Sequence, residues 1–572
     1  KYPVERLCLV AWTVRWLRGL RNRDVTFPLR FVPQILSRHK ISHRNSTPTH
    51  NPTTCTRMRM NKLVFPAFVV LILACVIIVI TSVSYATTGT KAATTTAGFN
   101  LTSASTEIES NAVPNDDFST NKTGTVAWSG VVTRPSQGRS LEPISSDEDP
   151  AHKEWVEDIP KLQLQPNVVY QPIQGFGYSL TGGSAQHLMT MSPESRAALL
   201  HELFVTRNFN VLRISIGASD LDETPFSYSD GPGEFSIDRD KEYLIPALKE
   251  IQAIQPNLVL LATPWSAPAW MKDNQSTVGG HLNPEYYQDY ASYLVQYLQA
   301  YQQEGIFITK MSLQNEPLNG SNNPSMLMTA EEQAIFLRDY LAPTLVTAGI
   351  AEWKSSGFST PIQILVFDHN PDNIKFPISL LSDPTIHSIV EGSAFHLYAG
   401  DIASLSQVHD AFPTKAIHFT EQWVSSDGNL EEDLLWYGRN VLIGGLSNFA
   451  QTILGWNLSS NSALTPHTEG GCSTCLGAVT IDNAVGVERN TAYYLLAHAA
   501  PYLPPGSVRI GSDLLNWPYG DDGTLHQVAF VTPTQQQIVL LLNEATTDYS
   551  VELPNGSQVT LFGRSLTTLV LD

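Results

Sequence analysis

Cysteine is scarce in this chain of 572 residues, which has five, and three of the five precede residue 87. Only Cys472 and Cys475 remain beyond that point, without a second cysteine pair or paired histidines. The ligand set of a zinc site is therefore incomplete, and we expect no metal ion and no cofactor. The C-x-x-C spacing also fits a redox-active pair, but we favour a small structural disulfide that pins a loop.

Net positive charge is confined to the beginning of the chain. Residues 1–86 carry 13 Lys and Arg against 2 Asp and Glu, whereas residues 87–572 carry 22 against 52, a net charge of −30 (22 − 52). So acidic a body disfavours nucleic acid or anionic lipid as its partner. It suits a protein that acts on a neutral substrate.

Long apolar runs are also rare, and the clearest is Leu63–Ile80. Basic residues precede it and small residues follow it, which predicts a signal peptide at 58–86. Residues 1–57 would then be a non-native upstream extension. Since the run also reaches the minimum length of a membrane span, an N-terminal anchor is the alternative. In both cases the rest of the chain faces outside, and we expect a secreted protein. Sequons for N-glycosylation fit this expectation and begin at Asn100, Asn121, Asn274, Asn319, Asn457 and Asn555.

Composition and periodicity divide the remaining chain into three parts. Residues 87–150 are rich in Thr and Ser and predict a disordered stalk, with order from about Trp155. Residues 157–500 alternate apolar runs with helical periodicity, which predicts an α/β fold, a (β/α)8 TIM barrel. A doubly wound sheet is the alternative, but it lacks the support of a Gly-rich phosphate loop. From 501 to 572 the period falls to two, which predicts a small all-β sandwich side domain with a strand donated by 155–170.

Eight nearly continuous apolar runs are typical of barrel strands covered on both faces. They are residues 173–177, 211–216, 258–263, 309–315, 362–367, 392–396, 416–420 and 452–456. Between them, the clearest helix is expected to begin at Asn283 as N-cap, with Pro284 in the first position.

Two of these strands end in a glutamate. Pro317 stops one strand directly after Asn315 and Glu316, because proline cannot continue a ladder, and Glu421 ends another. Catalytic groups of such barrels lie at the carboxyl ends of the strands, and glycoside hydrolysis needs two carboxylates. We predict Glu316 as the acid/base that holds a proton at rest, Glu421 as the ionised nucleophile, and Asn315 as a ligand of the sugar 2-hydroxyl. The alternative is that Glu316 and Glu421 are ordinary acidic residues of loops.

Aromatic residues at other strand ends suit a sugar substrate. Trp265 and Trp456 each follow a strand and predict a flat apolar platform, whereas Trp270 fits the core equally well. His396 and Tyr398 share one face at the end of the sixth strand and are expected to contact a carboxylate or a sugar.

Asp220 follows the second strand. Its carboxylate could bind sugar hydroxyls, or equally pair with Arg213 as part of the structure. Both alternatives stay open at this stage.

Together these motifs resemble glycoside hydrolase family 30, over about residues 157–572. The resemblance implies a (β/α)8 barrel, a side β-domain and retaining chemistry, with Glu316 as acid/base and Glu421 as nucleophile. It further implies glucose binding by Asp220, Trp265, Asn315 and Trp456. It rests on Gln174-Gly-Phe-Gly177, Leu212-Arg-Ile-Ser215, Pro264-Trp265, Asn315-Glu316-Pro317, His396-Leu-Tyr398, Thr420-Glu421 and Gly455-Trp456-Asn457.

The segments 315–328 and 470–477 look like the endo-β-1,6-glucanase branch of the family. We therefore expect a secreted retaining β-glucosidic hydrolase, an endo-β-1,6-glucanase that acts as a monomer on a β-glucan polysaccharide. A glucosylceramidase acting on a glucosylated lipid is the enzyme alternative and would need an apolar entrance. An alternative that is not an enzyme is a non-catalytic glucan-binding wall protein. The presence of both glutamates argues against it.

Overall fold

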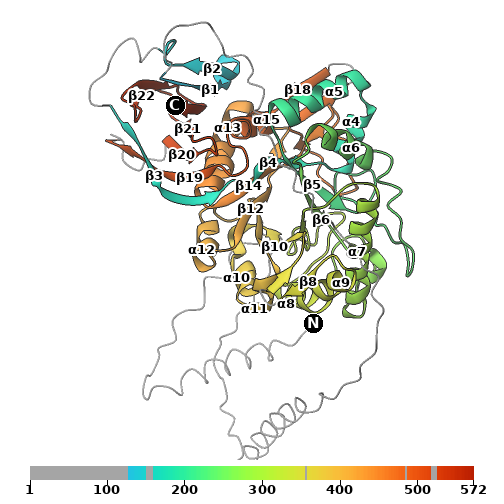
Figure 1. Cartoon of the computed structure of the whole chain (residues 1–572). Coiled ribbons are helices and arrows are strands. Elements are labelled where there is room, and N and C mark those ends of the chain that lie inside the picture. Colours follow the sequence, from blue (N-terminus) through green and yellow to red (C-terminus); the bar gives the residue numbers. More distant parts are fainter. Residues whose placement is uncertain (1–126, 150–158, 355–356, 483–485, 517–524, 572) are drawn as a thin grey trace, which may run out of the picture. The chain divides into compact units, whose positions relative to one another are not determined.

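The structure is a computed structural model that describes residues 127–149, 159–354, 357–482, 486–516 and 525–571 (Figure 1). All of them lie in the unit Asp117–Asp572. The predicted upstream extension, the signal peptide or anchor, and residues 87–126 of the predicted stalk lie outside these residues. Within the described ranges, no helix has both the length and the apolar character that crossing a bilayer requires.

Eight parallel strands close into a barrel, in which the last strand along the chain pairs with the first. All residues of five of these strands are buried, as expected for strands covered on both faces. The closed barrel confirms the predicted α/β fold and excludes the doubly wound sheet, whose edges stay open. In order around the barrel the strands are β4 (Gly175–Ser179), β5 (Val211–Ile216), β6 (Val259–Pro264), β7 (Lys310–Ser312), β10 (Gln363–His369), β11 (Gly392–His396), β12 (Ala416–Glu421) and β14 (Ala450–Asn457).

Helices follow the strands and surround the barrel (Figure 1). They are α4 (Gly182–Thr190), α5 (Pro193–His201), α6 (Leu244–Ile254), α7 (Tyr287–Gln303), α8 (Ala330–Ile335), α9 (Ala342–Thr347), α10 (Lys375–Leu381), α11 (Pro384–Ile389), α12 (Ser404–Ala411), α13 (Leu430–Tyr437), α14 (Gly444–Ser447) and α15 (Thr491–Ala497). Wider π-helical turns continue α5, α8 and α13 as η2 (Glu202–Thr206), η5 (Phe336–Leu341) and η7 (Gly438–Ile443).

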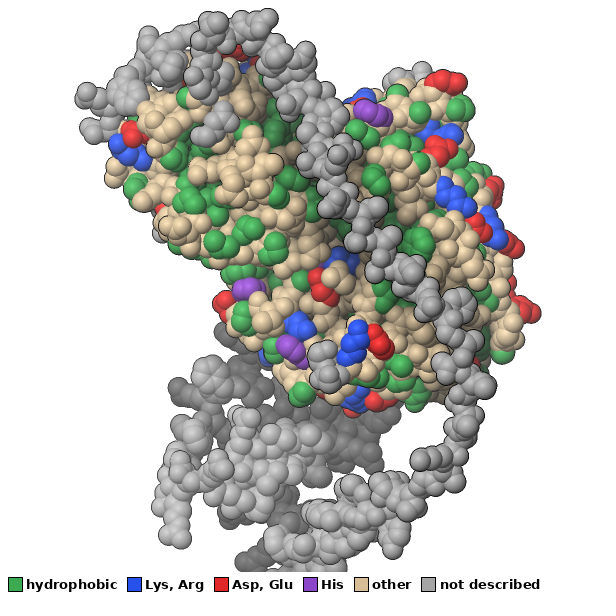
Figure 2. All heavy atoms as spheres, in the orientation of Figure 1, with side chains coloured by type: hydrophobic (Ala, Val, Ile, Leu, Met, Phe, Trp, Pro, Cys, Tyr) green, Lys and Arg blue, Asp and Glu red, His purple; other side chains and the backbone are tan. Residues whose placement is uncertain are grey.

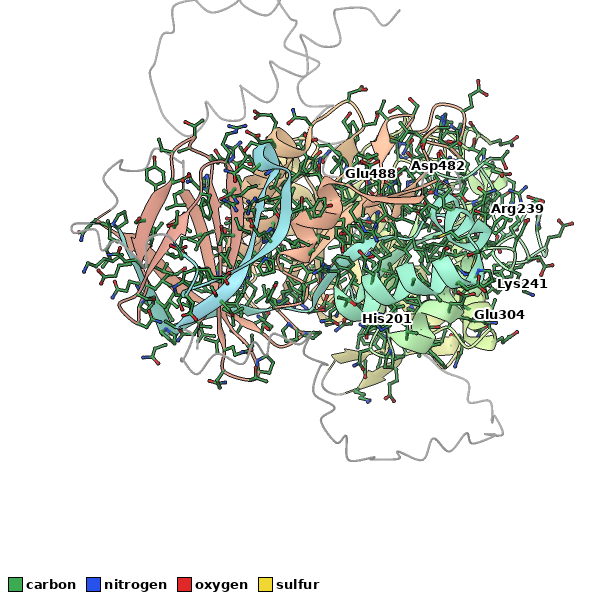
Figure 3. All side chains as sticks on the ribbon, turned by 90° about the horizontal axis from the view of Figure 1, so that it is seen from above. His201, Arg239, Lys241, Glu304, Asp482 and Glu488 are labelled. Atoms are coloured by element: carbon green, nitrogen blue, oxygen red, sulfur yellow. A yellow bond between two sulfur atoms is a disulfide. The ribbon has the colours of Figure 1, made fainter. Side chains whose placement is uncertain are left out.

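The longest of these helices, α7, begins one 3₁₀ turn later than the sequence predicts, although Asn283 does act as a cap. The Asn283 side chain accepts a hydrogen bond from the N–H of Glu285, and a 3₁₀ turn, η4 (Pro284–Tyr286), leads into the helix. On the outer surface beyond its end, Glu304 pairs with Lys241 at 3.6 Å and with Lys249 at 2.8 Å (Figure 3). Exposed pairs of this kind contribute about 0–1 kcal/mol each, so the stability of the barrel comes from its buried face.

The side domain is a nine-stranded sheet in the order β2-β1-β24-β21-β20-β19-β3-β22-β23. Its β3 precedes the barrel in the chain and pairs with β19, so a segment before the barrel does contribute a strand. The strands are β1 (Trp128–Arg134), β2 (Arg139–Ser145), β3 (Lys161–Pro172), β19 (Val508–Leu515), β20 (Leu525–Val531), β21 (Gln537–Asn543), β22 (Tyr549–Glu552), β23 (Gln558–Leu561) and β24 (Ser565–Leu571). Short ribbons elsewhere comprise β8 (Glu352–Lys354), β9 (Gly357–Ser359), β13 (Val424–Ser425), β15 (Ser459–Ser460), β16 (Cys475–Leu476), β17 (Val479–Asp482) and β18 (Gly486–Arg489).

The predicted stalk extends too far toward the barrel. Residues 128–134 form β1, which runs antiparallel to β24, and Trp128 is fully buried in the core of the sheet. The stalk boundary at residue 150 is therefore wrong. The composition of 87–150 hides this strand, because Thr and Ser around it outnumber its few apolar residues.

A buried histidine links the barrel to the sheet. The ring nitrogens of His498, directly after α15, lie 2.8 Å from the hydroxyls of Thr133 on β1 and Thr568 on β24. Burial lowers the pKa of His498 to about 3, so the ring is neutral where it bonds these hydroxyls.

On the face in Figure 2, basic and acidic side chains lie interspersed, and no extended basic patch gathers there among the described residues.

Candidate active site

The two predicted catalytic glutamates meet at the carboxyl ends of the barrel strands. Glu316 follows β7 and Glu421 ends β12. One carboxylate oxygen of each and one ring nitrogen of His396 all lie within 4.8 Å of one another, and all three residues are buried. Retaining glycosidases hold their carboxyl groups about 5–5.5 Å apart, whereas inverting enzymes leave room for a water molecule at about 6.5–9.5 Å. The observed separation suits a retaining reaction.

Arg213 organises the side of the site that holds Glu421. Its buried guanidinium donates to Glu421 Oε2, to Asn315 Oδ1 at 2.7 Å and to Asp368 Oδ2 at 3.0 Å. The Tyr398 hydroxyl donates to the other Glu421 oxygen at 2.9 Å. Arg213 therefore pairs with Asp368 and Glu421, and the alternative pairing of Arg213 with Asp220 is wrong.

Asp368, at the end of β10, is a buried carboxylate that the sequence analysis missed. It accepts hydrogen bonds from Ser312 and Thr420 at 2.6 Å and from His396 Nε2 at 3.2 Å. Burial raises the pKa of Asp368, but the Arg213 charge and these donors outweigh it and hold the pKa far below the usual range. An acid at the end of the apolar run 364–367 was the available signal, because Glu421 ends its own strand in the same way.

Glu316 lies between two histidines and an asparagine. Asn319 Nδ2 donates to Glu316 Oε2 at 2.7 Å, His396 Nδ1 lies 3.3 Å from Oε1, and His369 Nδ1 lies 4.0 Å from it. Burial raises the pKa of Glu316, but these neighbours lower it by more than burial raises it. The net shift of the pKa is therefore downward. The direction of this shift opposes the expectation that Glu316 carries a proton at rest.

The pKa of His396 shifts in the opposite direction. Burial lowers the pKa of His396, but Glu421, Asp368 and Glu316 together raise it to about 9. Its Nε2 faces Asp368, and its Nδ1 faces Glu316 and lies 3.7 Å from Glu421. A proton on Nδ1 is thus one hydrogen bond away from the Glu316 carboxylate.

The two predicted platform tryptophans pack against each other at the barrel mouth. The rings of Trp265 and Trp456 have centroids 5.4 Å apart, and the Arg213 guanidinium lies 4.7 Å above the Trp265 ring. Both rings are almost fully covered, so they do not form the open flat platform that the sequence predicts. Trp270 packs edge-on against Tyr286 and donates to a main-chain carbonyl, which is a structural role.

Asp220 lies in the loop after β5, near this pair of rings. It is buried, and its Oδ2 accepts a hydrogen bond from the N–H of Cys472 at 3.2 Å. Burial and the charge of Glu421 raise the pKa of Asp220 to about 7. The structure thus brings Asp220, His396 and Tyr398 into one charge network with the two glutamates.

Two family models cover most of the described chain. Residues 173–494 match the glycosyl hydrolase family 30 TIM-barrel domain, and residues 506–569 match the glycosyl hydrolase family 30 beta sandwich domain. The chain belongs to glycoside hydrolase family 30. It is therefore a glycosidase, and the family and the spacing of its carboxylates agree on retaining chemistry.

This family 30 enzyme is similar to proteins named for two different activities. The endo-1,6-β-D-glucanase neg1 of Aspergillus fumigatus is 30% identical over 434 residues, which cover 70% of this chain and 85% of that protein. A putative glucosylceramidase 2 of Caenorhabditis elegans is 28% identical over 444 residues, covering 70% and 82%. A solved endo-β1,6-glucanase structure matches with a TM-score of 0.68 and 32% identity over 78% of this chain and 99% of that chain.

The enzyme's central acid–histidine group has the spacing of a metal site. Glu316, His396 and Glu421 could each offer one ligand atom. A cation there would face the guanidinium of Arg213, which already bonds Glu421, and the proton on His396. This group therefore suits proton transfer better than metal binding.

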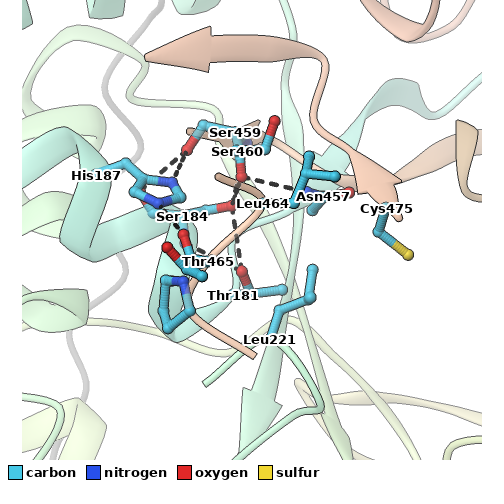
Figure 4. A pocket seen from close by; sticks show the side chains of 12 residues that line it. Thr181, Ser184, His187, Leu221, Asn457, Ser459, Ser460, Leu464, Thr465 and Cys475 are labelled. Atoms are coloured by element: carbon cyan, nitrogen blue, oxygen red, sulfur yellow. Dashed lines mark hydrogen bonds between the residues drawn. The ribbon is translucent and has the colours of Figure 1, made fainter. Parts of the chain in front are cut away.

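A serine and a histidine beside the barrel mouth do not form a second catalytic group. His187 Nδ1 lies 3.2 Å from Ser459 Oγ, and its Nε2 lies 2.7 Å from the carbonyl oxygen of Thr465 (Figure 4). Ser459 is almost fully buried, so no substrate carbonyl reaches its hydroxyl. We interpret this pair as a link between α4 and the segment after β14.

One sequon of the enzyme lies beside Glu316. Since the Asn319 side chain bonds Glu316, a glycan on Asn319 would place a sugar directly at the mouth of the site. Asn457 is buried, whereas Asn274 is exposed. We expect active secreted enzyme to carry glycan at Asn274 and none at Asn319 or Asn457. Enzymatic deglycosylation in ¹⁸O-labelled water followed by peptide mass spectrometry measures this, and ¹⁸O label at Asn319 in fully active protein would contradict it.

Proposed function

We propose that the protein is a secreted endo-β-1,6-glucanase in which Glu316 is the acid/base and Glu421 the nucleophile. The observation that carries the proposal is the pair of buried carboxylates within 4.8 Å at the barrel mouth, in a chain about 30% identical to a named endo-1,6-β-D-glucanase. Secretion is supported by the signal-peptide pattern of 58–86.

In the first step, a Glu421 oxygen attacks the anomeric carbon while the bond to the leaving oxygen breaks. Arg213 and Tyr398 hold one Glu421 oxygen each and so fix the direction of attack. The leaving oxygen takes a proton from Glu316, which receives it from His396 Nδ1 when the bound sugar displaces water from the mouth. In the second step, ionised Glu316 takes a proton from water, whose oxygen attacks the same carbon and releases Glu421.

The sugar ring that is attacked would lie between the tryptophan edges and the polar groups of the mouth. Asp220 and Asn315 supply oxygens and an amide beside Trp265 and Trp456. His396 acts on the carboxylates, because both of its ring nitrogens already face them. We therefore assign His396 to proton storage and not to direct sugar binding.

A glucan substrate fits the entrance better than a glucosylated lipid. Among the described residues, Leu318 is the exposed large apolar side chain next to Glu316, and it is 40% exposed. One leucine is not the contiguous apolar patch that the two chains of a ceramide would need. This observation favours the glucanase over the glucosylceramidase alternative.

A product profile on pustulan, laminarin and glucosylceramide tests the proposal. We expect a series of β-1,6-linked oligosaccharides from pustulan at early times, because internal bonds are cut, and little product from the other two. The Glu421→Gln variant serves as the inactive control. Glucose released from glucosylceramide with none from pustulan would favour the lipid alternative, and pustulan binding without hydrolysis would favour a non-catalytic wall protein.

A further inference from the structure

The loop Thr468–Cys475, here called the disulfide loop, closes over Asp220. The N–H of Thr468 donates to the Asp220 carbonyl oxygen at 2.9 Å, and the N–H of Cys472 donates to the Asp220 carboxylate at 3.2 Å. Both ends of Asp220, main chain and side chain, are therefore held by this one loop.

The fit between the loop and Asp220 is close. A Cβ atom on Gly471 would lie 2.5 Å from the Asp220 carbonyl oxygen, so only glycine allows the approach. The Thr468 hydroxyl donates at 2.5 Å to the carbonyl oxygen of Asn323, whose side chain donates back to the carbonyl oxygen of Glu469. The loop thus also contacts the segment that follows Glu316.

Cys472 and Cys475 form a disulfide that closes this loop across a sequence separation of 3. Cys475 is buried against Leu221, Trp265 and Trp456 (Figure 4 shows Cys475 beside Leu221). It also begins β16, which pairs with β13 shortly after Glu421. The bond therefore ties the N–H that Asp220 uses to a fixed point among the tryptophans.

We propose that the Cys472–Cys475 disulfide is a positioning element for Asp220, so that full activity requires the oxidised loop. The proposal rests on the proposed function, in which Asp220 contacts the sugar. A closed loop this short constrains the unfolded chain less than a long one does, so its main effect is local order, not global stability. Without the bond, the N–H of Cys472 is free to leave the Asp220 carboxylate.

Reduction is a balanced two-electron step. A dithiol such as dithiothreitol gives two electrons and two protons to the bond, Cys472 and Cys475 become thiols, and the reagent closes to its own cyclic disulfide. As isolated, the secreted enzyme should show no thiol from these two residues on titration under denaturing, non-reducing conditions.

The test compares wild type with the C472A/C475A and Asp220→Ala variants and with a variant carrying all three changes. We expect C472A/C475A to lose roughly tenfold to hundredfold in kcat/KM on an aryl β-glucoside, the range for a hydrogen bond to a charged group. The loss should vanish in the Asp220→Ala background, because coupled residues are not additive. Dithiothreitol should lower wild-type activity and leave the activity of C472A/C475A unchanged. That variant therefore controls for any other effect of the reagent.

Amide hydrogen exchange of residues 217–222 provides a readout that does not need activity. We expect faster exchange in this loop in C472A/C475A, with the exchange of the barrel strands unchanged. Wild-type kcat/KM in C472A/C475A, losses that multiply with Asp220→Ala, or unchanged exchange at 217–222 would each overturn the proposal. A wild type that cleaves no β-glucoside would instead refute the proposed function, and the exchange experiment would still decide the role of the disulfide.

Discussion

Replacing Glu421 by glutamine is expected to abolish turnover, with a loss in kcat on the order of 10⁴-fold or more, while the protein still folds and binds glucan. The amide has nearly the same shape and can accept from Tyr398, but it is a far weaker nucleophile toward the anomeric carbon. Arg213 keeps Asp368 as its partner, so the substitution leaves no unpaired buried charge. Steady-state hydrolysis of pustulan, glucan binding by calorimetry and thermal unfolding measure the three quantities.

The matched control is Glu304→Gln, the same change in an outer-surface carboxylate that pairs only with exposed lysines. It should keep wild-type kcat, since such pairs contribute about 0–1 kcal/mol. A Glu421→Gln enzyme with a rate near that of the control would remove Glu421 from the nucleophile role.

The Glu316→Ala variant should show a defect that depends on the leaving group. A sugar alcohol needs a proton to depart, and general acid catalysis is worth about 10²–10⁴-fold, so glucan hydrolysis should fall by that factor. An aryl glucoside with an acidic phenol leaves without this help, so glycosyl-enzyme should form almost normally. The second step then lacks its base, and the intermediate should accumulate as a burst of phenol in stopped-flow absorbance.

Azide separates these steps, because it attacks the intermediate without a base. We expect it to restore turnover in Glu316→Ala and to release β-glucosyl azide, identified by NMR. An α-azide product would mean single-step inversion and would contradict the retaining scheme. Equal losses on both substrates without azide rescue would exclude Glu316 as acid/base.

The barrel and its two glutamates could be predicted because their signals are local. Pro317 ends a strand beside Glu316, and a continuous apolar run ends at Glu421. Asp368 also carries a local signal, because it ends an apolar run, but its contacts with Arg213 and His396 could not be predicted. They depend on which strand ends converge once β10 closes between β7 and β11, and sequence spacing does not encode that convergence.

The position of the resting proton was the least predictable property of the site. It is decided by competition among Glu316, Glu421, Asp368 and the imidazole of His396 at distances of a few ångströms. Residue types alone suggest a protonated acid, as in many glycosidases. The three carboxylates around His396 favour a proton on the imidazole, and only coordinates reveal this arrangement.

The pairing of β1 with β24 joins the first described strand to the last, with Trp128 opposite Leu571. During synthesis the ribosome makes β1 long before β24. The barrel strands can therefore emerge and pair while the edge of β1 that later binds β24 is still unpaired. The side sheet is completed only when synthesis ends, so a nascent chain truncated before residue 565 would expose the apolar residues of β1 to the cell's folding machinery.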